Sequence, residues 1–152
     1  MLFQRIKRAD PEKVFMVVRN SYTVALTNGQ AVRWDFTTDV DGVGVEMPAA
    51  ITTCFGISAA GIVAESIGIN EYGLIQVYGY HSAVRVRVFT SSTTDIASGT
   101  PLALSAAGSV FCLEHFSTAT TSATPFRVPC AFALLAHTKW TTAAIACFIK
   151  AM

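Results

Sequence analysis

The chain has 152 residues, of which 52% are hydrophobic and only 14% are charged. Its formal net charge of +1 argues against a dedicated nucleic-acid-binding protein, which usually carries a clear basic excess. Average soluble domains hold roughly 25% charged residues, so we expect other subunits to cover part of the apolar surface. The length and composition therefore fit one domain with one core, in an oligomer or a larger assembly.

The basic residues gather at the N-terminus. The first nineteen residues hold five basic and two acidic side chains, whereas the rest of the chain holds six basic and eight acidic ones. We assign residues 1–13 to a basic N-terminal arm and residues 14–152 to a single β domain. The arm either docks on an acidic partner surface through Arg5, Lys7 and Arg8, or it is a solvated terminus.

The sequence predicts neither a signal peptide nor a membrane span. The first three residues run directly into charged residues, without an apolar region. The longest low-charge stretch, Met47 to Ala64, is interrupted by proline, glycine, serine and threonine. We therefore expect no membrane partner.

Short strand patterns follow one another along the chain, Glu and Lys are sparse, and β-branched residues are frequent. Asn28-Gly29 and Asp41-Gly42 are turn signals between strands, and the first predicts a hairpin. Many short strands separated by turns predict an all-β fold, either a compact β-barrel or a β-sandwich. The expected strands are, in chain order, Val14–Val18, Tyr22–Leu26, Ala31–Phe36, Val43–Met47, Thr52–Ser58, Gly61–Ala64, Leu74–Tyr80, Val84–Phe89, Pro101–Ser105, Ser109–Glu114, Phe132–His137 and Ala144–Lys150.

The run from Ile67 to Tyr80 is apolar at both odd and even positions. A strand with one solvated face alternates apolar and polar residues, so we expect this strand to be covered on both faces, by a core and by a second layer or subunit. In the next strand Arg85 and Arg87 alternate with valines and share one face. These arginines either bind the phosphate or carboxylate groups of a partner, or guard a solvated edge strand.

No residue pattern predicts a catalytic, cofactor or metal site. Cys112 and His115 are three residues apart, and Cys130 and His137 are seven apart, so along one strand each pair points to opposite faces. The histidines have no zinc-ligand spacing, and D-V-D-G at residues 39–42 lacks the downstream glutamate of a calcium loop. We expect no enzyme activity and no cofactor, with the four cysteines as buried free thiols.

Five segments of the C-terminal two-thirds resemble the small decoration (cement) proteins of tailed bacteriophage capsids. Tyr72–Gly79 resembles the Y-G-W-V-Q-V-x-G strand of that family, and Ser98–Leu102 resembles its A-G-D-x-L turn. Ala106–Val110 is similar to the hairpin tip that follows. Phe132–Ala136 and Ile145–Ile149 are similar to the closing pair of strands.

The resemblance implies a homo-oligomer, a trimer, that binds the outer surface of the major capsid protein shell and stabilises it. The protein would then lie on the capsid surface of the virion after assembly in the host cytoplasm. Two alternatives stay open at this point. One is another virion component, such as a head fibre base or a tail protein. The other is a glycan-binding β-module that uses Trp34, Trp140 and the tyrosines as a stacking platform.

Overall fold

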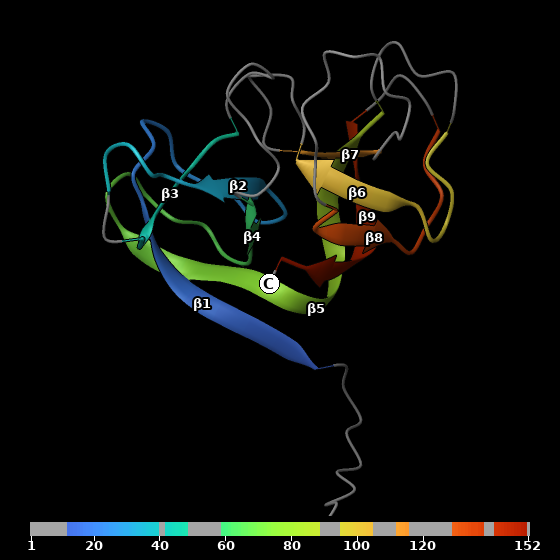
Figure 1. The fold of residues 1–152 in the computed structure, drawn as a ribbon, viewed down its shortest axis with the longest axis horizontal. Coiled ribbons are helices and arrows are strands. Elements are labelled where there is room, and N and C mark those ends of the chain that lie inside the picture. Colours follow the sequence, from blue (N-terminus) through green and yellow to red (C-terminus); the bar gives the residue numbers. More distant parts are fainter. Residues whose placement is uncertain are drawn as a thin grey trace, which may run out of the picture.

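The computed structural model describes residues 12–39, 42–48, 59–88, 95–104, 112–115, 129–138 and 142–151 (Figure 1). Within these ranges there is no helix, and nine strands form one sheet, which confirms the all-β prediction. Lys13, assigned above to the arm, is already the first residue of the sheet. The strands are β1 (Lys13–Asn20), β2 (Ala31–Trp34), β3 (Gly44–Glu46), β4 (Ala59–Val63), β5 (Tyr72–Arg87), β6 (Pro101–Leu104), β7 (Leu113–His115), β8 (Ala131–Ala133) and β9 (Thr142–Lys150).

The sheet closes on itself twice. β1, β3, β2, β4 and β5 are hydrogen-bonded in that order, and β5 pairs back with β1, which completes a ring of five strands. β5, β7, β6, β8 and β9 form a second ring in the same way, because β9 pairs back with β5. We call these rings barrel 1 and barrel 2. They share β5, which runs along one side of the molecule beside β1 and then enters barrel 2 (Figure 1).

The shared strand β5 has 16 residues, where the sequence predicted two separate strands. Its first half pairs with β1 and β4, and its second half pairs with β9 and β7. A register shift between His81 and Val84 lies between the two predicted strands. Gly79 also belongs to this transition, with φ at +101° and so little space that a Cβ would lie 1.9 Å from the Glu12 carbonyl oxygen. Only glycine therefore lets β1 begin so close to β5.

The two barrels are copies of one topology. In each, the opening strand is parallel to the third strand and antiparallel to the closing strand. The isolated bridge between Leu26 and Ile67 in barrel 1 matches the bridge between Ile96 and His137 in barrel 2, at residue numbers 70 higher. The pairing of β2 with β4 and that of β6 with β8 are related by the same offset. The chain is therefore an internal repeat in which one strand belongs to both units.

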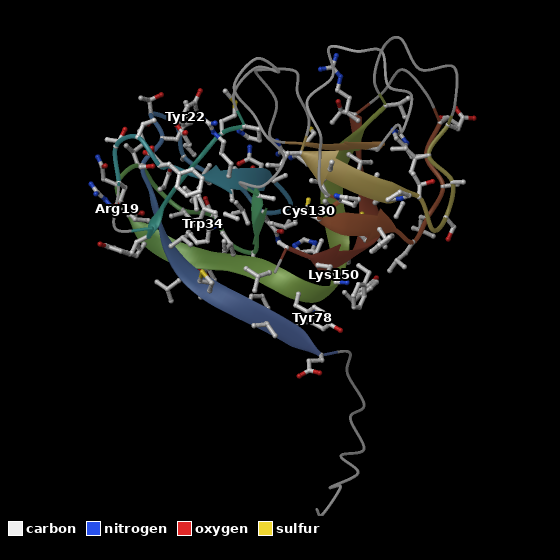
Figure 2. The ribbon with its side chains drawn as sticks, in the orientation of Figure 1. Arg19, Tyr22, Trp34, Tyr78, Cys130 and Lys150 are labelled. Carbon is white, nitrogen blue, oxygen red and sulfur yellow. The ribbon has the colours of Figure 1, made fainter. Side chains whose placement is uncertain are left out.

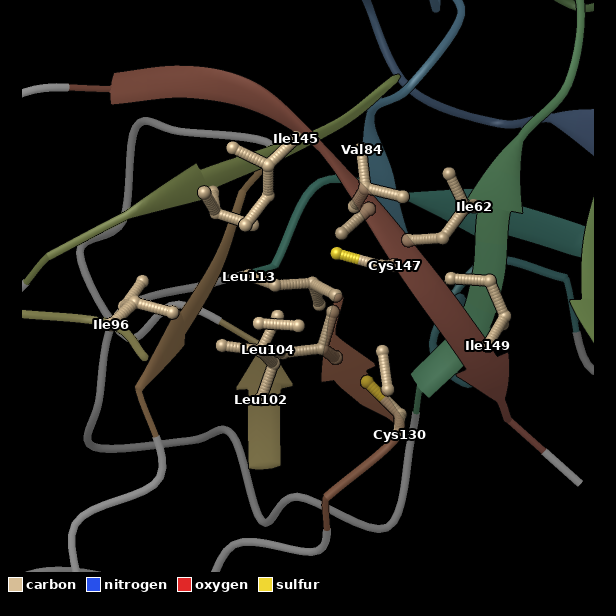
Figure 3. Close-up of a cluster of buried hydrophobic side chains, with 14 of the residues drawn as sticks. Ile62, Val84, Ile96, Leu102, Leu104, Leu113, Cys130, Ile145, Cys147 and Ile149 are labelled. Carbon is tan, nitrogen blue, oxygen red and sulfur yellow. The ribbon is translucent and has the colours of Figure 1, made fainter. Parts of the chain in front are cut away.

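Each barrel has its own apolar core. In β5, Ile75 and Val77 belong to the core of barrel 1, while Val84 and Val86 belong to the core of barrel 2. Figure 3 shows Val84 beside Ile145 and Cys147 in the barrel 2 core. The barrel 1 core consists of Val18, Leu26, Val32, Val45, Ala60, Val63, Ile67, Ile75 and Val77. The barrel 2 core is built mainly from Val84, Val86, Val88, Ile96, Leu102, Leu104, Leu113, Cys130, Ala131, Ala133, Ile145, Cys147 and Ile149, with Ala31 and Ile62 at its edge.

The predicted turns and hairpins have mixed outcomes. The strands expected at Pro101–Ser105 and Ser109–Glu114 predict a hairpin, and those at Phe132–His137 and Ala144–Lys150 predict a second pair. The structure confirms both, because β6 is antiparallel to β7 and β8 is antiparallel to β9. The Asn28-Gly29 turn exists, with Gly29 at φ +81°, but the hairpin predicted around it is wrong. The preceding segment forms no strand, and Leu26 bridges Ile67 instead of pairing with β2. The predicted strand Thr52–Ser58 lies outside the described residues.

Candidate interaction surface

Apolar side chains gather on the outer face of β1, β5, β9 and β8, together with the basic residues Arg19 and Lys150, which lie opposite Tyr72 and Tyr78. Val17 lies opposite Leu74, and Phe132 lies opposite Phe148, so the members of each pair share one face of the sheet. The Tyr78 ring meets the Phe148 ring edge-on with 5.2 Å between centroids, which joins the β5 and β9 parts of the patch (Figure 2). We call the following side chains the outer patch: Phe15, Val17, Tyr72, Leu74, Tyr78, Phe132 and Phe148.

Several side chains of the outer patch are more exposed than is usual for apolar residues in the strands of a monomer. Val17 is 60% exposed and Tyr72 is 66% exposed, although both belong to regular strands. β5 is an inner strand of the sheet, because it pairs with neighbours on both sides. From Gly73 to His81 its odd positions are buried, whereas Leu74 and Tyr78 at even positions are only half-buried and Gln76 between them is buried. The outer face therefore still lacks the cover that the sequence pattern predicted.

The first half of β1 also has an open edge. β5 pairs with β1 along most of its length, but β3 reaches only its last two residues on the other side. The Arg19 N–H donates to the Val43 carbonyl, away from β5. Backbone directions alternate along a strand, so Phe15 and Val17 also turn their N–H and C=O groups away from β5. In the part of the chain that the structure describes, no strand pairs with this edge. An exposed, apolar strand edge of this kind is a site for association.

Two of the five predicted contact residues belong to the part of the chain that the structure describes. Arg5, Lys7 and Arg8 lie outside the described residues. Arg85 and Arg87 lie on one face of β5, as predicted, with Arg85 exposed and Arg87 half-buried. The alternative in which they guard an edge strand is wrong, because β5 is shared by both barrels and pairs on both sides. Their role as contacts to a partner stays a prediction.

The Arg85 side chain has a structural partner. Its guanidinium donates to Thr27 Oγ1 at 3.1 Å, and its backbone N–H donates to the Gly29 carbonyl at 2.8 Å. These bonds hold the Thr27–Gln30 turn of barrel 1 against β5. Arg85 therefore connects the two barrels.

The cysteine side chains of barrel 2 are poor nucleophiles in this environment. Burial raises the pKa of Cys130 to about 12, and burial together with the neighbouring Cys130 raises that of Cys147 to about 12. Burial also raises the pKa of Cys112, although Arg85 and Arg87 act in the opposite direction. A catalytic thiol needs the opposite shift, because the thiolate is the nucleophile. All three are free thiols.

The titratable groups of the described chain do not gather into a metal site. No group of three histidine, cysteine or carboxylate side chains with suitable geometry occurs among the described residues. The buried His81 accepts a hydrogen bond at Nδ1 from the Ala83 N–H, and burial followed by the nearby Lys13 lowers its pKa. The described residues likewise contain no helix long and apolar enough to cross a membrane.

The sequence predicted a strand at Val14–Val18, but its exposure was missed, although a signal was present. Val14 to Val18 is apolar at every position, directly after the charged arm. The same absence of alternation was read as two-sided cover in the Ile67–Tyr80 run, and it applies equally to β1. Tyr72 lies in that same Ile67–Tyr80 run, whereas the exposed Phe132 had no such signal, because its exposure depends on where the chain folds.

Among known proteins, the chain is similar to solved structures. No protein-family model matches the chain, and no curated protein matches it. Among solved structures, the head fibre gp8.5 N base of bacteriophage phi29 is similar, with a TM-score of 0.43 and 9% sequence identity. The match covers 88% of this chain and 93% of that chain.

Proposed function

We propose that this protein is a structural component of a bacteriophage virion, a capsid decoration protein that binds the outer surface of the major capsid shell as a homotrimer and stabilises it. The observation that carries the proposal is the outer patch with its neighbouring open β1 edge. Both present apolar groups and backbone hydrogen-bonding groups on regular strands, ready for contact with other protein chains. The family resemblance of Tyr72–Gly79 supports the same assignment.

The mechanism is the simultaneous formation of several modest contacts. A rigid β scaffold loses little conformational entropy on binding, so the apolar outer patch contributes most of its burial energy to the contact. A trimer that binds three shell sites at once holds on more tightly than its single contacts would, because the second and third contacts form intramolecularly. Such bridging resists the separation of neighbouring capsid proteins. No catalytic step is required.

The basic arm adds electrostatic contacts to the apolar contacts of the outer patch. Arg5, Lys7 and Arg8 would dock on acidic groups of the major capsid protein, and Arg85 with Arg87 would add positive charge on the body. Contacts between exposed charges are screened within about 10 Å at 0.1 M salt. Attachment to shells should therefore weaken as salt rises, whereas the apolar contacts of the outer patch should persist.

Co-sedimentation with expanded capsid shells tests the proposal. The protein should pellet with shells and not with free capsid monomers. Tyr72→Lys, which places a charge on the outer patch, should weaken binding at least tenfold without changing the melting temperature. Phe36→Lys is a matched control, because Phe36 is 64% exposed but lies in the turn after β2. A protein that remains a monomer in light scattering and ignores shells would refute the proposal.

Two further measurements locate the binding mode. Deletion of residues 1–9 should weaken attachment to shells and leave folding intact, because a terminal arm adds little to the core. Electron microscopy of labelled protein should show copies spread over the shell. Copies confined to one vertex or to the tail would favour a head fibre base or a tail protein, and binding to a glycan array without shell binding would favour a glycan-binding module.

A further inference from the structure

The internal repeat shows how one barrel covers the opening strand of the next. The Thr27–Gln30 turn of barrel 1 lies on the edge of β5 where that strand enters barrel 2, held by the two hydrogen bonds from Arg85. The approach is so close that a Cβ on Gly29 would lie 2.1 Å from the Ala83 carbonyl oxygen. Gly29 and Gln30 are buried. This turn therefore closes an edge that would otherwise be open.

Barrel 2 carries the same turn in an uncovered state. The Gly99 N–H donates to the Ala133 carbonyl as the Gly29 N–H donates to the Val63 carbonyl, and φ is +84° at Gly99 and +81° at Gly29. Yet residues 97–99 are exposed, and in the described chain nothing lies within 4 Å of the place that a Gly99 Cβ would take. The turn has the shape for covering an edge and no edge beneath it.

The matching edge is the open one on β1. β1 is the opening strand of barrel 1, as the second half of β5 is the opening strand of barrel 2. The pairing registers align Arg19 with Arg87, so Val17 corresponds to Arg85. Arg85 holds the turn of barrel 1 on β5, and the residue that corresponds to it on β1, Val17, is 60% exposed.

The side chains at the two uncovered sites are complementary to each other. Inside the chain the contact is polar, between Arg85 and Thr27. The corresponding residues, Val17 and Ala97, are both apolar and both exposed. Leu135, which takes the place that Glu65 has in barrel 1, adds an apolar side chain that is 57% exposed. Burying such apolar surfaces against each other stabilises a contact between copies.

We propose that the Ala97–Thr100 turn of one copy covers the β1 edge of the next copy, around Phe15 and Val17, in the way that the Thr27–Gln30 turn covers β5 within the chain. The contact is head-to-tail, because each copy offers one turn and one edge. Such a contact generates a closed ring, for example a trimer, when its rotation closes. The inference depends on the self-association in the proposed function but not on binding to shells.

Blocking the two halves of the contact separately tests this arrangement. Val17→Lys blocks the edge and leaves the turn intact, because Ala97 offers a charged side chain no hydroxyl of the kind that Thr27 offers Arg85. Ala97→Lys blocks the turn and leaves the edge intact. In light scattering, the unmodified protein should be an oligomer and each variant alone a monomer. An equimolar mixture should form a dimer and nothing larger, because only one productive contact remains. The melting temperature of each monomer should show that it is folded.

Other outcomes would overturn the arrangement. Val24→Lys is the control, because Val24 is 54% exposed but belongs to neither the β1 strand nor the Ala97–Thr100 turn, and it should leave the mass of the oligomer unchanged. A mixture that stays monomeric would point to a symmetric contact, in which the same surface meets itself. Val17→Lys with the mass of the unmodified protein would remove β1 from the interface. An oligomer that assembles as described but ignores shells would contradict only the proposed function.

Discussion

Barrel 1 and barrel 2 share one topology and fill it differently. Barrel 1 contains buried polar side chains, of which Asn20 is the best connected. Its amide Nδ2 donates to the carbonyls of Val24, Ile67 and Gly68, and its Oδ1 accepts from the Tyr22 N–H. The buried core of barrel 2 is made of aliphatic side chains and the two cysteines Cys130 and Cys147. One small ring of strands can thus be closed by side-chain hydrogen bonds or by packing alone.

The difference shows which features the fold requires and which it leaves free. Both barrels keep a glycine with positive φ at the same turn, and both keep the bridge that follows. In the segments 26–34 and 96–104 all other side chains differ, although Leu26 and Ile96, and likewise Val32 and Leu102, stay apolar and buried. Backbone geometry is therefore the shared requirement, while the interior and the outer surface have diverged. Four experiments sharpen this contrast.

The largest effect is expected from substitutions at the two equivalent glycines. Gly29→Ala strains a positive φ and also forces a Cβ into the Ala83 carbonyl, whereas Gly99→Ala strains φ alone. We expect losses in the free energy of unfolding of about 4 kcal/mol and about 1 kcal/mol respectively. Both substitutions are made in the Val17→Lys background. Their urea denaturation is compared at a protein concentration at which Val17→Lys is monomeric. Equal losses would contradict the described contact with β5.

The next largest loss of stability is expected at Asn20, where barrel 1 has a buried polar side chain and barrel 2 has a buried apolar one. Val88 follows Arg87 in barrel 2 as Asn20 follows Arg19 in barrel 1, and both are buried. Asn20→Val should cost about 3 kcal/mol of stability, because buried carbonyls lose their donor. Asn20→Asp is the matched variant, since it keeps the size but also removes the donating amide. Denaturant melts in which Asn20→Val unfolds like the unmodified protein would show that the hydrogen bonds contribute little.

Acid should lower the stability of barrel 1 by protonating Asp35. Burial alone would raise the pKa of this carboxyl, but hydrogen bonds from Thr38, Ser21 and Thr37 lower it to about 2. The folded pKa lies below the ordinary value of 3.8, so the contribution to stability is present above that pH and disappears as the pH falls through about 2. Asp35→Asn should cost about 2 kcal/mol near neutral pH.

Urea melts of Asp35→Asn and the unmodified protein over a range of pH measure this contribution. The difference between the two proteins should shrink steadily below a pH of about 4. A difference that stays constant down to the lowest pH at which both are folded would mean that the charge of Asp35 has no role. The neutral asparagine keeps the side-chain size, so packing is held constant.

The smallest effect on stability, and a distinct chemical one, is expected for the thiols of barrel 2. With pKa values of about 12, Cys130 and Cys147 should react with a disulfide reagent near pH 8 on the order of a thousandfold more slowly than in the unfolded chain. Cys54, outside the described residues, is replaced by serine so that it does not contribute. Fast labelling of the folded protein would contradict the burial of these thiols.

The sequence was sufficient to predict the fold class and most strand positions. Alternation and turn residues are local properties, and they located the β6–β7 and β8–β9 pairs. The division of β5 into two strands was wrong because the shift between His81 and Val84 interrupts the pattern without ending the strand. The hairpin at Asn28-Gly29 was wrong because the Leu26 backbone bonds to Ile67, which is distant in sequence.

The repeat and the outer patch could not be read from the chain. In the segments 26–34 and 96–104, only Gly29 and Gly99 are identical at the 70-residue offset, since a small barrel core accepts many apolar combinations. The patch joins Val17, Leu74 and Phe148, which come from three strands. Its existence depends on strand pairing over long sequence distances. The apolar run in β1 was the one local sign of it.

The shared strand β5 has a consequence for how such a chain can grow. A barrel of this type needs an opening and a closing strand, and here the closing strand of the first barrel is also the opening strand of the second. A third barrel would therefore require only four new strands and another 70 or so residues, joined onto an extended β9. Conversely, neither unit can be excised as a separate domain without taking β5 with it, so the natural unit of duplication and the natural unit of folding have different boundaries in this protein.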